Sequence, residues 1–200
     1  MLRTFLPTVL LFGAVIAAQV NTARQYPIDT NHSTVGFSVP ILDGLSKVKG
    51  KFTDFTVTLT NDEKDITKSS VSVVIKAASI DTGINQRDAH LRTADFFDVE
   101  KYPEITFQSK RIEKRANQLV VVGTFTMHGV SREIELPFTT TGVNKDTTTG
   151  KMNVGYSARL MLNRRDFGMN WHHPTLQNFV GDDVDVEIEL ITKAVAIDAK

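Results

Sequence analysis

The sequence contains no cysteine and carries no net charge. Without cysteine the chain has no disulfide, no thiolate metal site, no thiol redox chemistry and no cysteine nucleophile. Its 23 lysines and arginines balance 23 aspartates and glutamates, so no net field attracts nucleic acid or an anionic membrane. Aromatic residues with a polar group are scarce, with one Trp and three Tyr against 12 Phe. This imbalance favours aromatic rings in dry surroundings, because a Phe ring has no polar group to keep wet.

The motifs of common catalytic and nucleotide-binding sites are also missing. The chain has no G-x-G-x-x-G or P-loop after a strand-like segment, and no G-x-S-x-G context that would expose a nucleophile. Its five histidines lack H-x-x-x-H and H-E-x-x-H spacing. The neighbours His172 and His173 would point to opposite faces of an extended chain. We therefore predict no catalytic residue, no cofactor, no metal site and no nucleic-acid partner.

The first 18 residues have the three parts of a secretory signal peptide. One cation, Arg3, precedes an apolar run over residues 5–18 that ends in small residues. This run is shorter than the about 20 apolar residues that span a bilayer, and the chain turns polar directly after Ala18. We therefore predict cleavage of residues 1–18, export to the periplasm without a stable membrane anchor, and a single domain over residues 19–200. An uncleaved anchor is the alternative.

Beyond residue 27, apolar and polar residues alternate with a period of two. The clearest case is residues 184–190, where every even position is aliphatic and every odd position is acidic. Such stretches, rich in Val, Ile, Thr and Phe, are typical of antiparallel strands with one dry and one wet face. Eight are recognisable, at residues 35–39, 55–60, 71–76, 104–108, 119–125, 134–138, 152–160 and 184–190. An all-β chain of this kind closes as a barrel or folds as a sandwich, and the period alone does not decide which.

Two long segments, residues 79–103 and 163–183, break the alternation. Connections of this length are usually functional or packed as a lid, and we expect one or two short helical turns in the first. Each segment places arginine near aspartate, as Arg87 with Asp88 and Arg164 with Asp166. One interpretation is an Arg–Asp pair that ties a loop to the rim of the sheet. The other is an arginine that binds the polar or anionic head of a ligand, since its planar donors suit phosphate.

These segments, together with several others, resemble the YceI-like family. The resemblance covers about residues 26–191 and rests on residues 29–39 (DTNHSTVGFSV), 49–52 (KGKF), 78–82 (ASIDT), 87–91 (RDAHL), 95–98 (DFFD), 102–103 (YP), Gly123 with 128–130 (HGV), and 163–169 (NRRDFGM). It implies an eight-stranded antiparallel lipocalin-like β-barrel in the periplasm that holds a long apolar lipid. The lipid would be a polyisoprenoid, an isoprenoid quinone or a fatty amide, held for transport, storage or stress protection. Pro40 and Ile41 stand where the family often has a basic residue and a histidine, which argues against a head-group contact at that edge.

Strand parity and the loop aromatics supply candidate residues for the lining of an apolar tunnel. They are Val35, Phe37, Val39, Phe107, Phe125, Phe138, Met161, Phe167, Met169 and Trp171. The polar candidates at the rim are Arg87, Asp88, His90 and Arg164. Two alternatives to a lipid-binding protein stay open, as does a homodimer. One is an enzyme acting on such a lipid, with His90 and Asp88 as acid–base pair, and the other is a ligand-free β-sandwich interaction module with a full core.

Overall fold

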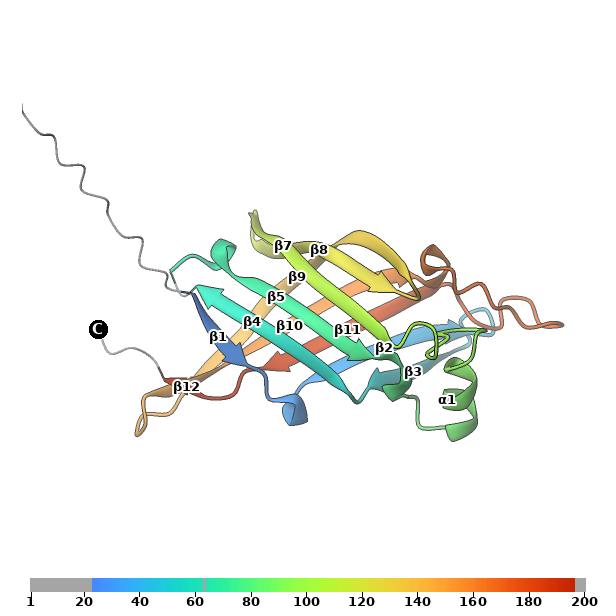
Figure 1. The fold of residues 1–200 in the computed structure, drawn as a ribbon, viewed down its shortest axis with the longest axis horizontal. Coiled ribbons are helices and arrows are strands. Elements are labelled where there is room, and N and C mark those ends of the chain that lie inside the picture. The colour runs from blue at the N-terminus through green and yellow to red at the C-terminus, as the bar shows by residue number, and fades with distance from the viewer. Residues whose placement is uncertain (1–22, 63, 197–200) are drawn as a thin grey trace, which may run out of the picture.

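The computed structural model describes residues 23–62 and 64–196, which form one curled antiparallel sheet with a short helix at one end (Figure 1). The strands are β1 (Ala23–Pro27), β2 (Thr34–Ile41), β3 (Ser46–Phe52), β4 (Phe55–Asp62), β5 (Ser70–Lys76), β6 (Ile80–Asp81), β7 (Glu104–Arg115), β8 (Gln118–Met127), β9 (Val130–Lys145), β10 (Lys151–Asn163), β11 (Asp183–Ile191) and β12 (Val195–Ala196). The helix is α1 (Asn85–Leu91), and short 3-10 helices are η1 (Thr30–His32), η2 (Ile66–Lys68), η3 (Ala77–Ser79) and η4 (Arg164–Phe167). The signal peptide predicted at residues 1–18 lies outside the described residues. Among the described residues, no helix combines the length and the apolar character that a membrane crossing requires.

The sheet curls until its two ends meet beside the β3–β4 connection. Its strand order is β1-β4-β5-β7-β8-β9-β10-β11-β2-β3-β6, and β12 pairs with β10. Only Thr53 and Asp54 separate β3 from β4 in the chain, yet no ladder joins these two strands in the described part of the structure. Instead the connection bonds to other segments. The amide of Thr53 donates to the carbonyl of Ser79 (3.1 Å), and the carbonyl of Asp54 accepts from the amide of Lys76 (3.0 Å). The result is a barrel-like shell with a seam between β3 and β4.

The prediction of an all-β antiparallel, barrel-like fold is confirmed, but the count of eight strands is wrong. The described residues form nine long strands, β2 to β5 and β7 to β11, besides the short β1, β6 and β12. The long strand missing from the prediction is β3, whose inward positions are Val48, Gly50 and Phe52. A glycine at the middle of these positions interrupts the apolar pattern and hides the strand. The helical turns expected within residues 79–103 correspond to α1.

Strand β11 illustrates how the alternation produces an interior. Its even positions from 184 to 190 line the inside of the shell, while Glu187 and Glu189 are exposed outside. The inward side chains are nevertheless only half-buried. A tightly packed core would bury such aliphatic groups almost completely. Their partial exposure therefore indicates that they face open space within the shell.

One closely packed part of the core lies at the α1 end of the sheet. Ile80 and Phe167 are each 1% exposed there, and Met169 is buried beside them. Helix η4 begins where the side chain of Asn163 accepts a hydrogen bond from the amide of Arg165 (3.0 Å), an ordinary N-terminal cap. It ends at Gly168, whose positive φ of 78° suits glycine. This turn reverses the chain and carries residues 168–182 across the end of the shell.

Candidate functional site

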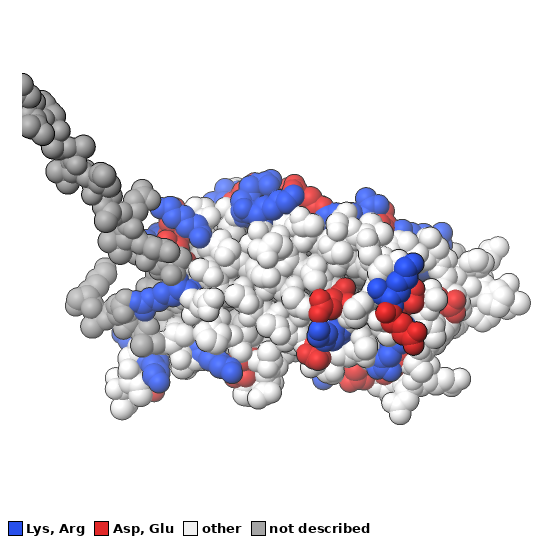
Figure 2. Space-filling model, viewed as in Figure 1, with Lys and Arg blue, Asp and Glu red and all other residues white. Residues whose placement is uncertain are grey.

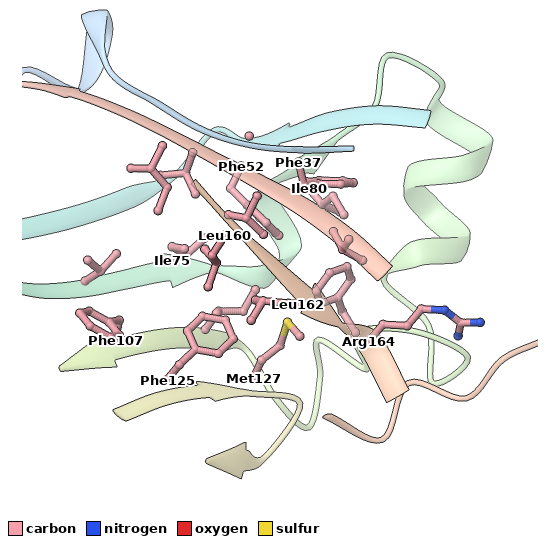
Figure 3. Close-up of a pocket in the computed structure, with 18 of the residues that line it drawn as sticks. Phe37, Phe52, Ile75, Ile80, Phe107, Phe125, Met127, Leu160, Leu162 and Arg164 are labelled. Atoms are coloured by element: carbon pink, nitrogen blue, oxygen red, sulfur yellow. The ribbon is translucent and has the colours of Figure 1, made fainter. Parts of the chain in front are cut away.

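The shell encloses an apolar cavity with a volume of about 170 Å³. Figure 3 shows side chains from strands on all sides converging on it. Apart from Gly36 and Arg164, the residues of its wall are all apolar. The residues labelled in Figure 3 are Phe37, Phe52, Ile75, Ile80, Phe107, Phe125, Met127, Leu160, Leu162 and Arg164. A wall without free hydrogen-bonding groups repels water and favours a hydrocarbon occupant.

A second cavity of about 90 Å³ continues the interior away from α1. Ile66 and Ser69, from the connection between β4 and β5, close its wall together with Phe138 and Tyr156. The two cavities share six wall residues, namely Val57, Val73, Phe107, Leu136, Ile188 and Leu190. Side-chain movements at this shared wall would join them into one elongated apolar space. Burial raises the pKa of the Tyr156 phenol, as expected in a poorly solvated position.

A glycine widens the larger cavity on the β2–β3 side. Gly50 is paired with Phe37 across these strands. A Cβ atom at position 50 would lie only 2.5 Å from Cζ of Phe37. The absence of a side chain thus lets the Phe37 ring lie flat against the sheet. Phe52, with a ring centroid 5.9 Å from that of Phe37, extends the aromatic wall toward Phe97.

The segments around α1 and after η4 form a lid over the α1 end of the larger cavity. From the first come Leu91, Phe96 and Phe97, and from the second come Met169 and Val180. Trp171 locks the two segments together, with its ring centroid 5.2 Å from that of Phe96 and 5.3 Å from that of His90. The lid is therefore built from the two segments that the alternation did not explain.

The structure places most of the predicted apolar residues on the cavity walls. Val35, Phe37, Val39, Phe107, Phe125 and Met169 line the larger cavity, and Phe138 lines the smaller one. Phe167 instead packs in the core, edge-on to Phe125 with ring centroids 5.3 Å apart. Trp171 belongs to the outer layer of the lid. Contact of any of these residues with a ligand stays a prediction.

The placement of Met161 inside the shell is wrong. Met161 is 61% exposed, whereas its neighbours Leu160 and Leu162 line the larger cavity. Because consecutive side chains in a strand alternate between faces, an error of one residue moves the whole set to the other side. The sequence ambiguity arises because residues 160–162 are all apolar. The pairing of β10 with β11, whose faces are unmistakable, resolves it.

Three of the predicted rim residues stabilise the α1 segment and do not line the cavity. Asp88 is buried, and its Oδ1 accepts hydrogen bonds from the amide (2.9 Å) and hydroxyl (2.5 Å) of Thr82. Arg87 donates from Nε to the same hydroxyl (2.7 Å) and from Nη2 to the Thr82 carbonyl (2.8 Å). His90 Nε2 lies 2.7 Å from Oδ2 of Asp95. Asp88 and His90 thus have different partners, and the acid–base pair considered above is not formed.

Arg164 is the rim candidate that reaches the cavity, but its guanidinium is already engaged. Nη1 donates to the carbonyl of Met169 (2.6 Å), Nε to the carbonyl of Gly181 (3.0 Å) and Nη2 to Oδ1 of Asp182 (2.9 Å). Burial lowers the pKa of Arg164, an effect that Asp182 opposes. In Figure 3 the guanidinium points away from the apolar side chains, so the stem alone faces the cavity. The arginine tightens both ends of the lid segment.

Several wall residues were absent from the sequence prediction. They include Phe52, Leu160, Leu162 and the even positions of β11. The strict alternation of residues 184–190 was a sufficient signal for β11, whereas Phe52 lies in the strand that was missed. In the described ranges, no cluster of three or more His, Asp or Glu side chains is arranged to hold a metal ion.

Fold and site together define an all-β, barrel-like protein built around an elongated apolar interior. Residues 26–192 match the family model of the YceI-like domain, and the chain belongs to this family. A UPF0312 protein of Photorhabdus laumondii is 37% identical over 147 residues, which are 72% of this chain and 76% of the relative.

Two solved structures extend the comparison. The Campylobacter jejuni YceI protein is 34% identical with a TM-score of 0.66, over 87% of this chain and 99% of that protein. A polyisoprenoid binding domain from Saccharophagus degradans, implicated in plant cell wall breakdown, has a TM-score of 0.59 over 85% of this chain and 98% of that domain. Its identity of 19% makes this a likeness of fold.

Proposed function

We propose that this protein binds a long apolar lipid inside its shell, with a polyisoprenoid as the first candidate and an isoprenoid quinone or fatty amide as related ones. The observation that carries the proposal is the apolar wall that continues from the larger cavity into the smaller one. The Saccharophagus degradans domain of the same fold, which is a polyisoprenoid binding domain, supports the choice of lipid. A protein with a full core, the interaction module considered above, would have no such space.

The energetics of burying a hydrocarbon chain agree with this proposal. An engineered apolar cavity of about 150 Å³ is sufficient for benzene, and the larger cavity has about 170 Å³, so a longer chain requires both cavities and the side-chain movements that join them. Each buried CH₂ group contributes about 0.8 kcal/mol, so ten groups contribute about 8 kcal/mol. This corresponds to about micromolar affinity before ordering costs. Binding of this kind requires no catalytic group, and we propose a carrier or storage protein rather than an enzyme.

The cellular location is part of the proposal. The predicted signal peptide at residues 1–18 supports export to the periplasm. There the protein would keep a water-insoluble lipid dispersed for transport, storage or protection during stress. Native mass spectrometry of protein purified from its own host should reveal a co-purified lipid and, in the same spectrum, the oligomeric state.

A titration with geranylgeraniol tests the proposal directly, with the fluorescence of Trp171 as reporter. Trp171 is the chain's only tryptophan and packs on Phe96, which lines the cavity. A saturable fluorescence change is expected for the unmodified protein. Val73→Phe adds a ring at the wall shared by both cavities and should weaken binding at least tenfold. Met161→Phe, the matched control on the outer face, should bind normally. Equal binding by both variants, or ligand-free protein that takes up no prenyl chain, would refute the proposal.

A further inference from the structure

Three leucines project into solvent at the α1 end of the molecule. Leu45 is 86% exposed, Leu176 is 46% exposed and Leu42 is 37% exposed. They come from two touching segments, the β2–β3 turn (residues 42–45) and residues 174–179, which we call the apolar tip. The amide of Leu42 donates to the carbonyl of Phe179 (3.1 Å), and the amide of Asp43 donates to that of Asn178 (3.2 Å). In Figure 2 this end of the molecule protrudes and carries few charged side chains on the visible face.

The β2–β3 turn adopts a costly backbone conformation at one of these leucines, Leu42. Leu42 and Asp43 both have positive φ values, 51° and 53°. The amide of Gly44 donates to the carbonyl of Ile41 and closes the turn. Tight hairpin turns of this kind normally carry Asn, Asp or Gly at the central positions. A leucine with positive φ is a rare arrangement, and strain of this type is concentrated at functional sites.

A row of lysines begins directly behind the tip. Lys47, Lys49 and Lys51 are exposed on the outer face of β3, and the residues paired with them on β2 carry no charge. Lys51 is also paired with Asp81 on β6, which leaves Lys47 and Lys49 as the lysines without a charged residue opposite them on a neighbouring strand. The charge of Lys47 also acts on Asp185, but that carboxylate already accepts two hydrogen bonds from Arg159. Lys47 and Lys49 are therefore a local positive feature next to the tip, whose own acidic residue, Asp43, accepts a hydrogen bond from the side chain of Asn178 (2.6 Å). Exposed apolar groups beside lysines match the interface of a membrane that contains anionic lipids.

The apolar tip is also connected to the lid of the cavity. Val180 lines the larger cavity. It directly follows Phe179, whose carbonyl accepts the hydrogen bond from the amide of Leu42. Ile41 and Val180 form a short β-bridge, so the turn and the lid segment share backbone contacts. A partner that binds the apolar tip would therefore lie next to the lid of the larger cavity.

We propose that this end of the protein docks reversibly on an anionic lipid bilayer. Leu42, Leu45 and Leu176 enter the interface, and Lys47 and Lys49 meet the phosphate head groups. Docking itself needs no bound ligand, and only the passage of a lipid between bilayer and cavity rests on the function proposed above. The docking surface is thus a separate feature from the cavity and can be tested separately.

Co-sedimentation of the full chain with vesicles tests the proposal. Binding is expected to phosphatidylglycerol-containing vesicles, weaker binding to pure phosphatidylcholine, and a decrease with added salt. Leu45→Ser should weaken the partition coefficient about tenfold, since a leucine side chain no longer leaves water. Val143→Ser is the matched control, because Val143 is 59% exposed on β9 near the opposite end. Lys47→Gln with Lys49→Gln should weaken binding to anionic vesicles alone, whereas Lys151→Gln at the far end should leave it unchanged.

Leu42→Asn separates docking from folding. Asparagine tolerates positive φ, so this variant should unfold at a higher temperature and yet bind vesicles more weakly. Equal vesicle binding by the tip and control variants would overturn the proposal. So would self-association in the absence of vesicles that Leu45→Ser abolishes, because the tip would then be an interface between copies of the chain. Uptake of geranylgeraniol from solution by Leu45→Ser should be normal, which distinguishes failure of docking from failure of the lipid-binding function.

Discussion

The ring of Phe107 occupies the space that a side chain at position 123 would need. The two residues lie on the adjacent strands β7 and β8, and a Cβ atom on Gly123 would come within 2.5 Å of Cζ of Phe107. It would also lie 2.5 Å from the carbonyl oxygen of Gln108, which is backbone and cannot move aside easily. Since Phe107 belongs to the wall shared by both cavities, this glycine helps to set the position of a ring that lies between them.

Gly123→Ala should therefore push the Phe107 ring into the interior and strain the β7–β8 ladder. We expect a loss of about 1–3 kcal/mol in the free energy of unfolding, as for other overpacked cores. Affinity for a ligand long enough to span both cavities should fall as well. Chemical denaturation and the prenyl-alcohol titration measure the two effects. Gly142→Ala is the control, because a Cβ atom at position 142 would lie in open space; a similar loss in both variants would contradict the steric explanation.

Arg164 and Arg165 offer a matched comparison within one 3-10 turn. Both pair with Asp182, but the Arg164 side chain is 5% exposed and the Arg165 side chain 53%. Arg164→Met keeps an apolar stem at the cavity and leaves the carbonyls of Met169 and Gly181 without their donor. We expect a loss of about 2–3 kcal/mol and faster amide hydrogen exchange across residues 169–182. Arg165→Met should cost less than about 1 kcal/mol. Unchanged exchange in Arg164→Met would show that the arginine does not hold the lid.

The strands and the apolar character of the interior could be predicted because both depend on short-range alternation. Residues 184–190 left no ambiguity, since acidic side chains do not enter an apolar interior without a partner. Where both faces of a strand carry apolar residues, as at Met161, the period identifies the strand but not the inner face. Gly50 hid β3 for a related reason, because an inward glycine removes the apolar signal at the centre of the strand.

The roles of the rim residues could not be predicted, because the folded geometry of the two loops, and not adjacency in the sequence, selects their partners. Arg164 is paired with Asp182, 18 residues further on, rather than with the neighbouring aspartate at position 166. Asp88 accepts hydrogen bonds from Thr82, and His90 shares a hydrogen bond with Asp95. The sequence indicated that these polar groups were functional or structural, and the folded geometry assigns them to the support of the lid.

Asp88 should matter for stability more than for binding. Asp88→Ala removes a buried carboxylate and leaves the amide and hydroxyl of the partly buried Thr82 without this acceptor, and we expect a loss of about 1–3 kcal/mol in the free energy of unfolding. Asp95→Ala, at an exposed partner of His90, should have a much smaller effect. Both variants should bind geranylgeraniol with unchanged affinity. A specific loss of affinity in Asp88→Ala without a loss of stability would instead favour a ligand-contacting role.

Asp185 and Arg159 should give the protein an acid-sensitive contribution to stability. The hydrogen bonds from Arg159, with Nε 2.7 Å from Oδ1, hold the pKa of the Asp185 carboxyl below its ordinary value. The unfolded chain then binds a proton more readily than the folded chain. The stabilisation is therefore complete above the unfolded pKa, about 3.9, and disappears as the pH falls through the lower folded pKa.

Arg159→Met removes this donor pair and should raise the pKa of Asp185, which an NMR titration of its carboxyl carbon measures. The variant should be less stable than the unmodified protein at pH 7, and the difference should shrink as the pH falls below about 4. Arg159→Lys, which retains the charge but not the paired geometry, should lie between the two. If the unfolding free energies of Arg159→Met and the unmodified protein differ by a constant amount at every pH, the loss comes from packing of the arginine stem rather than from the carboxylate.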